Sequence, residues 1–183
     1  LLPDAPMLLT VSALEKRKGV QWMVRALPRV IEALPDVVYV VVGDGPYKET
    51  VRSLADELGI ADRVRFLGAR TDVARFYQAA DLMVMLSKGE ASSLVSLESL
   101  ACGTPVIASR HPPFDELIAP EWGRQVDEGD SPALVETIVG LLSAPKQLQR
   151  MSKAGQSHIV HHHTWHQVAE NYLEILRETR NRI

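Results

Sequence analysis

Short runs of mostly apolar residues recur along the chain, and each has the length of a single strand. The runs are residues 7–11, 37–42, 64–67, 82–86, 105–108 and, with a weaker pattern, 123–126. Near-continuous apolar runs are typical of strands that are covered on both faces, as in a parallel sheet. The pattern therefore predicts six buried strands.

Segments with helical periodicity separate these runs. In residues 20–34 the apolar side chains share one face, Pro35 should end the helix, and Pro28 should kink or break it. Further helical patterns run from Gly45-Pro46 to Gly59-Ile60 (a left-handed cap), from Thr71-Asp72, from Ser92 or Ser93 to Gly103, through 131–142 and 145–161, and after Thr164. This alternation predicts one α/β domain with a doubly wound, mostly parallel, Rossmann-like sheet.

Composition and charge exclude several classes of protein. The 183 residues suit one domain, and a net charge of −3 gives no basic surface of the kind that binds nucleic acid. Cys102 is the single cysteine, which excludes an internal disulfide and fits a reducing compartment. The sequence has no apolar run long enough to span a membrane. Leu1 in place of Met, followed soon by a strand, indicates a piece of a longer protein.

Ligands of a doubly wound sheet bind at the carboxyl ends of its strands, so the loops after the strands should carry the chemistry. The sequence contains no G-x-x-x-x-G-K-[ST] phosphate-binding loop. Its nearest approach to G-x-G-x-x-G is Gly43-Asp44-Gly45, which follows the second strand and has Lys48 in place of the third glycine. These observations argue against a P-loop nucleotidase and against a dinucleotide-dependent oxidoreductase.

Two glutamates lie eight positions apart after the fourth predicted strand. Glu90 falls in the loop before a helix, and Glu98 falls inside that helix, leaning back toward its N-terminus. The first-turn N–H groups of Leu94 and Val95, together with the helix dipole, favour an anion between the two carboxylates. A nucleotide sugar could touch Glu98, the helix N-terminus and Glu90 in that order. Taken alone, two glutamates at this spacing are more often simply solvated.

The surrounding residues resemble the signature of family 4 retaining glycosyltransferases, which have the two-Rossmann-domain GT-B architecture. The signature is Glu90, seven residues, Glu98, and then the turn and strand at 101–107. Further matches follow the family's order at Lys18-Gly19, 42–46, 63–68, Asp81 and Thr164-Trp165. The resemblance covers nearly the whole chain. It implies that residues 1–183 form the C-terminal, nucleotide-sugar-binding domain, with the N-terminal acceptor domain absent from this chain.

The resemblance also implies a role for each matched position. Glu90 would contact the donor sugar near the reacting carbon, Lys18 would neutralise the diphosphate, and Glu98 would bind the ribose hydroxyls. Main-chain groups would hold the distal phosphate (Leu94, Val95), the sugar (Ala91, Ser92, Ser93) and the edge of the base (Gly68, Ala69, Arg70). The implied reaction transfers a sugar from a nucleoside diphosphate sugar to a sugar, lipid or other acceptor with retained configuration. It implies no cofactor and no metal.

The chain departs from the family pattern at three places. Ser12-Ala13-Leu14 replaces Gly-Arg-Leu, so that Ala13 stands where an arginine pairs with the diphosphate. Lys16 or Arg17 could replace that arginine, or both could be solvated. Residues 91–93 replace Gly-Phe-Gly, and residues 111–116 replace Gly-Gly-x-Pro-Glu with only the final glutamate kept.

Two other functions stay open. A donor-binding module that has lost catalysis is favoured by Ala13, whereas a sugar-nucleotide 2-epimerase of the same architecture is disfavoured by the glutamate pair. The histidines at 161–163 and 166 are predicted to be solvated or to cap a helix, because three sequential histidines cannot converge on one metal ion. We expect a cytoplasmic protein, free or held at the inner membrane face through the missing domain.

Overall fold

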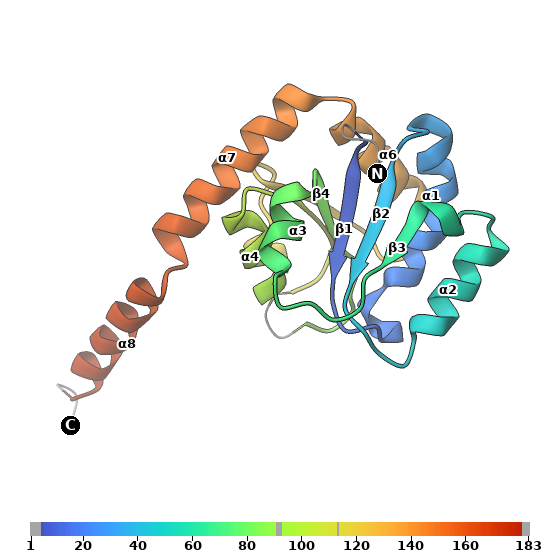
Figure 1. The fold of residues 1–183 in the computed structure, drawn as a ribbon. Helices are drawn as coiled ribbons and strands as arrows, with labels where there is room; N and C mark the ends of the chain where they lie inside the picture. Colours follow the sequence, from blue (N-terminus) through green and yellow to red (C-terminus); the bar gives the residue numbers. More distant parts are fainter. Residues whose placement is uncertain (1–4, 91–92, 113, 181–183) are drawn as a thin grey trace.

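A parallel sheet of six strands organises the part of the chain that the structure describes (Figure 1). This structure is a computed structural model, and it describes residues 5–90, 93–112 and 114–180. The strands are β1 (Met7–Val11), β2 (Val38–Val42), β3 (Val64–Phe66), β4 (Leu82–Met85), β5 (Val106–Ser109) and β6 (Gly123–Val126). They lie in the order β3-β2-β1-β4-β5-β6, which confirms the predicted doubly wound sheet.

Helices cover both faces of this sheet. One face carries α1 (Val20–Ala33), α2 (Lys48–Glu57) and α6 (Ser131–Leu142), and the other carries α3 (Val73–Ala79), α4 (Leu94–Ala101) and α5 (Phe114–Leu117). From α6, α7 (Pro145–His162) runs back to pack against α4, and α8 (Trp165–Arg180) then projects from the domain (Figure 1). Two short 3₁₀ turns, Lys16–Lys18 and Ala61–Arg63, complete the described elements.

The central strands β1, β2 and β4 are almost entirely apolar because their alternate residues enter two separate cores. On β1, Leu8 joins the core beneath α1, α2 and α6, whereas Leu9 and Val11 join the core beneath α3, α4 and α5. Thr10 is the polar exception on β1. Its hydroxyl donates to the carbonyl of Val84 at 2.7 Å and accepts from the hydroxyl of Tyr39 at 2.7 Å, so the buried polar group is satisfied.

Several helix boundaries follow from glycine and proline, with one correction. The predicted left-handed cap is confirmed, because Gly59 has a φ of 67° and the N–H of Ile60 donates to the carbonyl of Ala55 at 3.0 Å. Of the two outcomes predicted for Pro28, a kink or a break, the break is wrong, since α1 continues through the proline. Proline removes one backbone donor, and the fully buried face of α1, including Val24 and Leu27, outweighs that loss.

The starts of three helices also differ from what the sequence pattern predicts. The second helix begins at Lys48, not at Gly45-Pro46. Asp72 and Ser93 occupy the N-cap positions of α3 and α4, but neither side chain caps a helix N–H among the described residues. Asp72 instead accepts two hydrogen bonds from Arg70, and the Ser93 hydroxyl lies 2.6 Å from that of Ser96. A competing local partner therefore replaces the cap in both cases.

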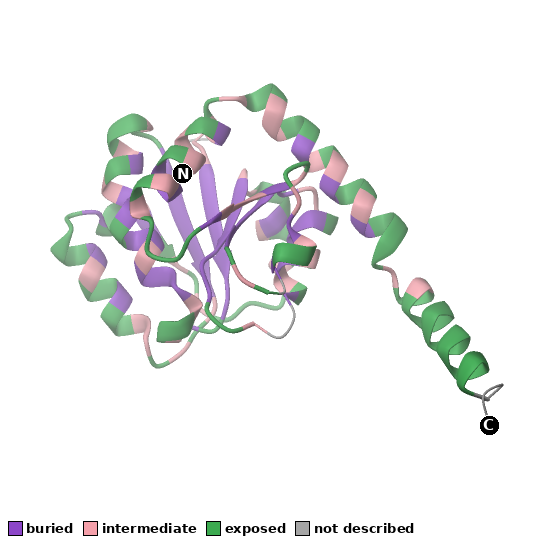
Figure 2. Cartoon of the chain, turned by 180° about the vertical axis from the view of Figure 1, so that it is seen from behind, coloured by how far each residue is buried: buried purple, intermediate pink, exposed green. Residues whose placement is uncertain are grey.

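The last helix leaves the domain with its apolar side chains exposed (Figure 2). Trp165, Tyr172 and Leu176 are 87%, 66% and 63% exposed. Their spacing of seven and four residues places them along one side of the helix. Among the residues described, no helix combines the length and apolar character needed to cross a membrane.

Candidate functional site

The centre of the sheet contains the topological switch point, where β1 and β4 are neighbours but send the chain to opposite faces. In open α/β sheets, a crevice forms at this point between the two loops. A cavity of about 280 Å³ lies there. Its lining consists of Val11, Ser12, Ala13, Arg17, Lys18, Met85, Glu90, Leu94 and Val95. The fold therefore brings together Ala13, Lys18, Glu90, Leu94 and Val95, five of the site residues predicted from the sequence.

An ion pair joins the two sides of this cavity. The Nζ of Lys18 lies 2.6 Å from Oε1 of Glu90, with side-chain exposures of only 13% and 10%. The guanidinium of Arg17 lies 3.8 Å from the same oxygen but is half exposed. Burial opposes ionisation of Glu90, yet the hydrogen bond from Lys18 and the positive charges of Lys18 and Arg17 outweigh it and lower the pKa below its ordinary 4.5. Glu90 is therefore a carboxylate at neutral pH.

Backbone contacts hold the two loops in register beneath this ion pair. The N–H of Lys88 donates to the carbonyl of Arg17 at 2.7 Å. Gly19 has a φ of 74°, and a Cβ at this position would overlap the carbonyl of Leu86. Only glycine tolerates both conditions. The Lys18-Gly19 pair thus combines a charged side chain with the residue that lets the first loop contact Leu86, directly after β4.

The glycines after β2 support the first loop in the same way. A Cβ at Gly43 would overlap the carbonyl of Ser12, and one at Gly45 would crowd the backbone of Leu14. The N–H of Leu14 donates to the carbonyl of Asp44 at 2.9 Å. The two glycines of Gly43-Asp44-Gly45 therefore permit close packing of the loops after β1 and β2. This packing role accounts for the two glycines without a bound dinucleotide.

The N-terminus of α4 supplies backbone donors to the cavity. The N–H groups of Ser96 and Leu97 donate to the carbonyl of Ser93, at 3.0 and 3.1 Å. Those of Leu94 and Val95 have no acceptor among the described residues, as expected for a first helical turn. Ser93 itself is buried, with its hydroxyl directed at its own helix. The two other predicted sugar-contacting residues, Ala91 and Ser92, lie outside the described residues.

Glu98 lies outside the described lining of the cavity and faces α3. The hydroxyl of Tyr77, on α3, donates to Oε2 of Glu98 at 3.0 Å. Tyr77 is 1% exposed, whereas Glu98 is exposed. Burial, followed by the negative charge of Glu98, raises the pKa of Tyr77, so the phenol stays protonated and keeps its role as donor. Tyr77 falls within the helix predicted to start at Thr71-Asp72, but the sequence does not show where its hydroxyl points.

The stretch predicted to read the base edge lies at the end of β3, apart from the described cavity lining. The carbonyl of Gly68 accepts from the N–H of Gly43 at 2.8 Å, and Ala69 follows in the same loop. Arg70 binds Asp72 through two hydrogen bonds of 2.9 Å, with its guanidinium 5.6 Å from the ring centre of Phe76. This loop shares the carboxyl edge of the sheet with the cavity, one strand beyond β2.

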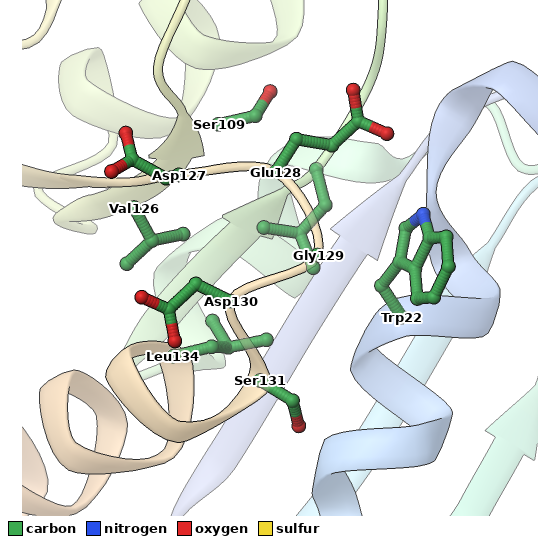
Figure 3. A pocket seen from close by; sticks show the side chains of 10 residues that line it. Trp22, Ser109, Val126, Asp127, Glu128, Gly129, Asp130, Ser131 and Leu134 are labelled. Carbon is green, nitrogen blue, oxygen red and sulfur yellow. The ribbon is translucent and has the colours of Figure 1, made fainter.

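A second, much smaller cavity lies at the same edge, near the ends of β5 and β6 (Figure 3). Its volume of about 20 Å³ suits about one water molecule. Figure 3 shows Trp22 of α1 across from the loop that carries Glu128 and Asp130. Asp130 caps α6 by accepting from the N–H of Ala133 at 3.0 Å, and Glu128 pairs with Lys88. The ion pair therefore joins this loop to the loop after β4. The small cavity has no room for a nucleotide sugar.

The histidines gather around the end of α7. His158 stacks on Trp122, and its Nε2 lies 3.3 Å from Nε2 of His163, while His161 bonds the carbonyl of Ser157 at 2.7 Å. Within the described ranges, no group of three or more His, Cys, Asp or Glu side chains is placed to hold a metal ion. The run makes local contacts on an exposed helix end.

The fold and the position of the switch-point cavity define a doubly wound α/β domain with its candidate site at the switch point. Residues 2–158 match the family described as glycosyl transferases group 1, and the chain belongs to that family. It is 33% identical over 181 residues to a GDP-mannose-dependent monoacylated alpha-(1-6)-phosphatidylinositol monomannoside mannosyltransferase of Corynebacterium glutamicum, covering 94% of this chain and 47% of that protein. It is 30% identical to the N-acetyl-alpha-D-glucosaminyl L-malate synthase of Bacillus anthracis, covering 95% and 47%.

Solved structures share the same architecture. The sucrose-phosphate synthase of Thermosynechococcus elongatus superposes with a TM-score of 0.90 at 28% identity, over 100% of this chain and 47% of that one. Anabaena HepE, solved in complex with UDP-glucose, superposes with a TM-score of 0.88 at 24% identity, over 96% and 49%, and shares the fold. The chain thus spans about half the length of these relatives.

Proposed function

We propose that this chain is the donor-binding domain of a retaining GT-B glycosyltransferase, which transfers a sugar from a nucleoside diphosphate sugar to an acceptor. The observation that carries the proposal is the meeting of Lys18 and Glu90 at the switch point, beside the N–H groups of Leu94 and Val95, which have no acceptor among the described residues. Family membership and the UDP-glucose complex of HepE support the same class of donor. A nucleoside diphosphate sugar is the ligand that uses all of these groups.

The proposed mechanism stabilises the diphosphate as it leaves. Negative charge grows on the leaving group, and Lys18, Arg17 and the first turn of α4 present positive charge and donors to it. These groups would neutralise the diphosphate without a metal ion or another cofactor. Glu90 would orient the sugar and stabilise positive charge at the reacting carbon. We assign Glu90 no covalent role, and front-face attack by the acceptor would retain the configuration.

The acceptor side of the reaction is proposed to lie on a further, N-terminal domain, because the relatives are about twice as long as this chain. The exposed apolar side of α8 supports further protein beside the described domain, since a helix with Trp165, Tyr172 and Leu176 in water is unusual. The acceptor would be a sugar, a lipid or another hydroxyl compound, used in the cytoplasm or at the inner membrane face. A donor-binding module without catalysis is the second candidate, favoured by Ala13 in the cavity lining.

A thermal-shift and calorimetry panel of uridine, guanosine and adenosine diphosphate sugars tests the donor site. One of them should stabilise the fold by roughly 2.7 kcal/mol at a hundred times its dissociation constant. Lys18→Met should weaken that binding, with Lys146→Met, on the exposed surface of α7, as the control. Failure of every donor to bind would overturn the proposal. Turnover by the full-length protein, with the anomeric configuration of the product read by NMR, separates the enzyme from the inactive module.

A further inference from the structure

We propose that Tyr77 is a positioning residue for the donor's ribose, because its buried hydroxyl fixes the carboxylate of Glu98 in one orientation. The proposal rests on the proposed function, in which Glu98 binds the ribose diol. Tyr77 belongs to α3 and Glu98 to α4, and the two side chains meet at 3.0 Å between hydroxyl and Oε2. Tyr77 would act through Glu98 and would not touch the ligand itself.

Both the side chain and the backbone of Tyr77 are held in place by neighbouring residues. Its side chain is 1% exposed and packs in the core beneath α3 and α4. The carbonyl of Tyr77 accepts a hydrogen bond from the buried hydroxyl of Thr104, at the turn that leads into β5. These contacts fix the position of the Tyr77 hydroxyl. Its hydrogen bond in turn holds the carboxylate of Glu98 in one orientation.

Glu98 gains more from this contact than most surface glutamates would. A free glutamate side chain samples several rotamers, and a ligand that needs one of them must restrict the others on binding. Here the restriction occurs when the chain folds, before any ligand arrives. The tyrosine occupies one lone pair of Oε2, which leaves the other carboxylate oxygen to accept both hydroxyls of a ribose diol.

Tyr39 carries a buried hydroxyl whose surroundings differ from those of the Tyr77 hydroxyl. Tyr39 is also fully buried, but its hydroxyl donates to Thr10, a buried residue inside the sheet. Tyr77 instead directs its hydroxyl from the core to an exposed, charged side chain, which lies about one helical turn along α4 from Leu94 in the cavity lining. This difference makes Tyr39 the matched control.

The test is a double-mutant cycle of Tyr77→Phe and Glu98→Ala, read by titration calorimetry with the preferred nucleoside diphosphate and with inorganic pyrophosphate. Tyr77→Phe should weaken nucleoside diphosphate binding by about three- to tenfold, the range expected for one hydrogen bond. Pyrophosphate has no ribose, so its affinity should not change. In the Glu98→Ala background, Tyr77→Phe should have no further effect. Tyr39→Phe should leave both affinities unchanged.

Each contrary outcome is distinct. Equal loss of pyrophosphate and nucleotide binding in Tyr77→Phe, or the same loss with and without Glu98, would show a general structural role and overturn the proposal. Weaker nucleotide binding in Glu98→Ala but not in Tyr77→Phe would overturn the role of Tyr77 and leave the donor site intact. Absence of nucleotide binding in the unmodified chain would overturn both the donor site and this role.

Discussion

The ammonium group of Lys18 lies 2.6 Å from the carboxylate of Glu90, although the two residues are 72 positions apart in sequence. One follows β1 and the other follows β4, so their contact closes the switch point from both sides. Both side chains are nearly buried, and neither can be changed without altering the charge of the other's surroundings. A substitution of Lys18 should therefore change the pKa of Glu90, and a substitution of Glu90 should change how Lys18 binds phosphate.

Lys18→Met should raise the pKa of Glu90. Burial already raises the pKa of Glu90 by favouring the neutral carboxyl. The substitution removes the hydrogen bond and the positive charge of Lys18, both of which lower that pKa. In the unmodified chain the folded-state pKa is below 4.5, so Glu90 stabilises the fold fully above that pH and loses this contribution as the pH falls through the folded-state value. Carboxyl ¹³C NMR titration, with urea unfolding at several acidic pH values, measures both effects.

Arg17→Met is the control for this prediction, because Arg17 is farther from the same oxygen and is half exposed. It should shift the pKa of Glu90 less than Lys18→Met does. An equal shift in both variants would mean that general positive charge, and not the close ion pair, sets the pKa.

Glu90→Gln should reduce turnover of the full-length enzyme strongly without weakening binding of the bare nucleoside diphosphate. The carboxylate is proposed to face the sugar, which the bare nucleotide lacks, and its removal frees Lys18 for the phosphates. Steady-state kinetics and calorimetry on the same variant provide the two readings. Turnover within a few fold of the unmodified enzyme would reduce Glu90 to a residue that only positions the sugar.

The sequence predicts the sheet well because burial on both faces leaves a mostly apolar run at each strand, weakest at β6. β1 and β6 have the predicted bounds, and the other strands differ by a residue at one end or both. Local details are less predictable where two partners compete for one group. Asp72 could cap α3 or bind Arg70, and only the folded loop shows that it binds Arg70.

The site is predictable where main-chain geometry and a family resemblance agree. Lys18, Glu90 and the first turn of α4 converge because parallel strands end at one edge. The hydrogen bond between Tyr77 and Glu98 is different, since it joins two helices whose packing depends on the whole core. No spacing in the sequence encodes that contact.

Cys102 should report the charge of Glu98 through its reactivity. Burial, followed by the negative charge of Glu98, raises the pKa of this thiol above its ordinary value. Iodoacetamide should therefore alkylate Cys102 more slowly than a free thiol at pH 8, and Glu98→Gln should increase the rate in part. Mass spectrometry follows the reaction cleanly, because the chain contains no other cysteine. An unchanged rate in Glu98→Gln would contradict the placement of the two side chains.

Ala13→Arg tests the departure from the family pattern that bears most directly on activity. Ala13 lines the cavity with Lys18 and Glu90, and it is exposed, so an arginine fits there without overpacking the core. A charge-assisted contact to the diphosphate contributes roughly 1.5–3 kcal/mol, so the affinity for the preferred nucleoside diphosphate should rise on the order of tenfold or more. Repulsion from Lys18 and Arg17 opposes the gain, and Glu90 competes for the new guanidinium.

The control for that substitution is Ala79→Arg, which adds the same charge at an exposed position near the end of α3. It should leave the affinity unchanged, and melting of both variants should show that each remains folded. Tighter binding in Ala13→Arg alone would place residue 13 beside the diphosphate and show that the chain lacks one phosphate contact of its family. Unchanged binding in a folded Ala13→Arg variant would mean that Arg17, which already lines the cavity, fills that role. The native loop would then have moved its phosphate-binding cation four residues along the chain, while keeping the charge that the leaving group requires.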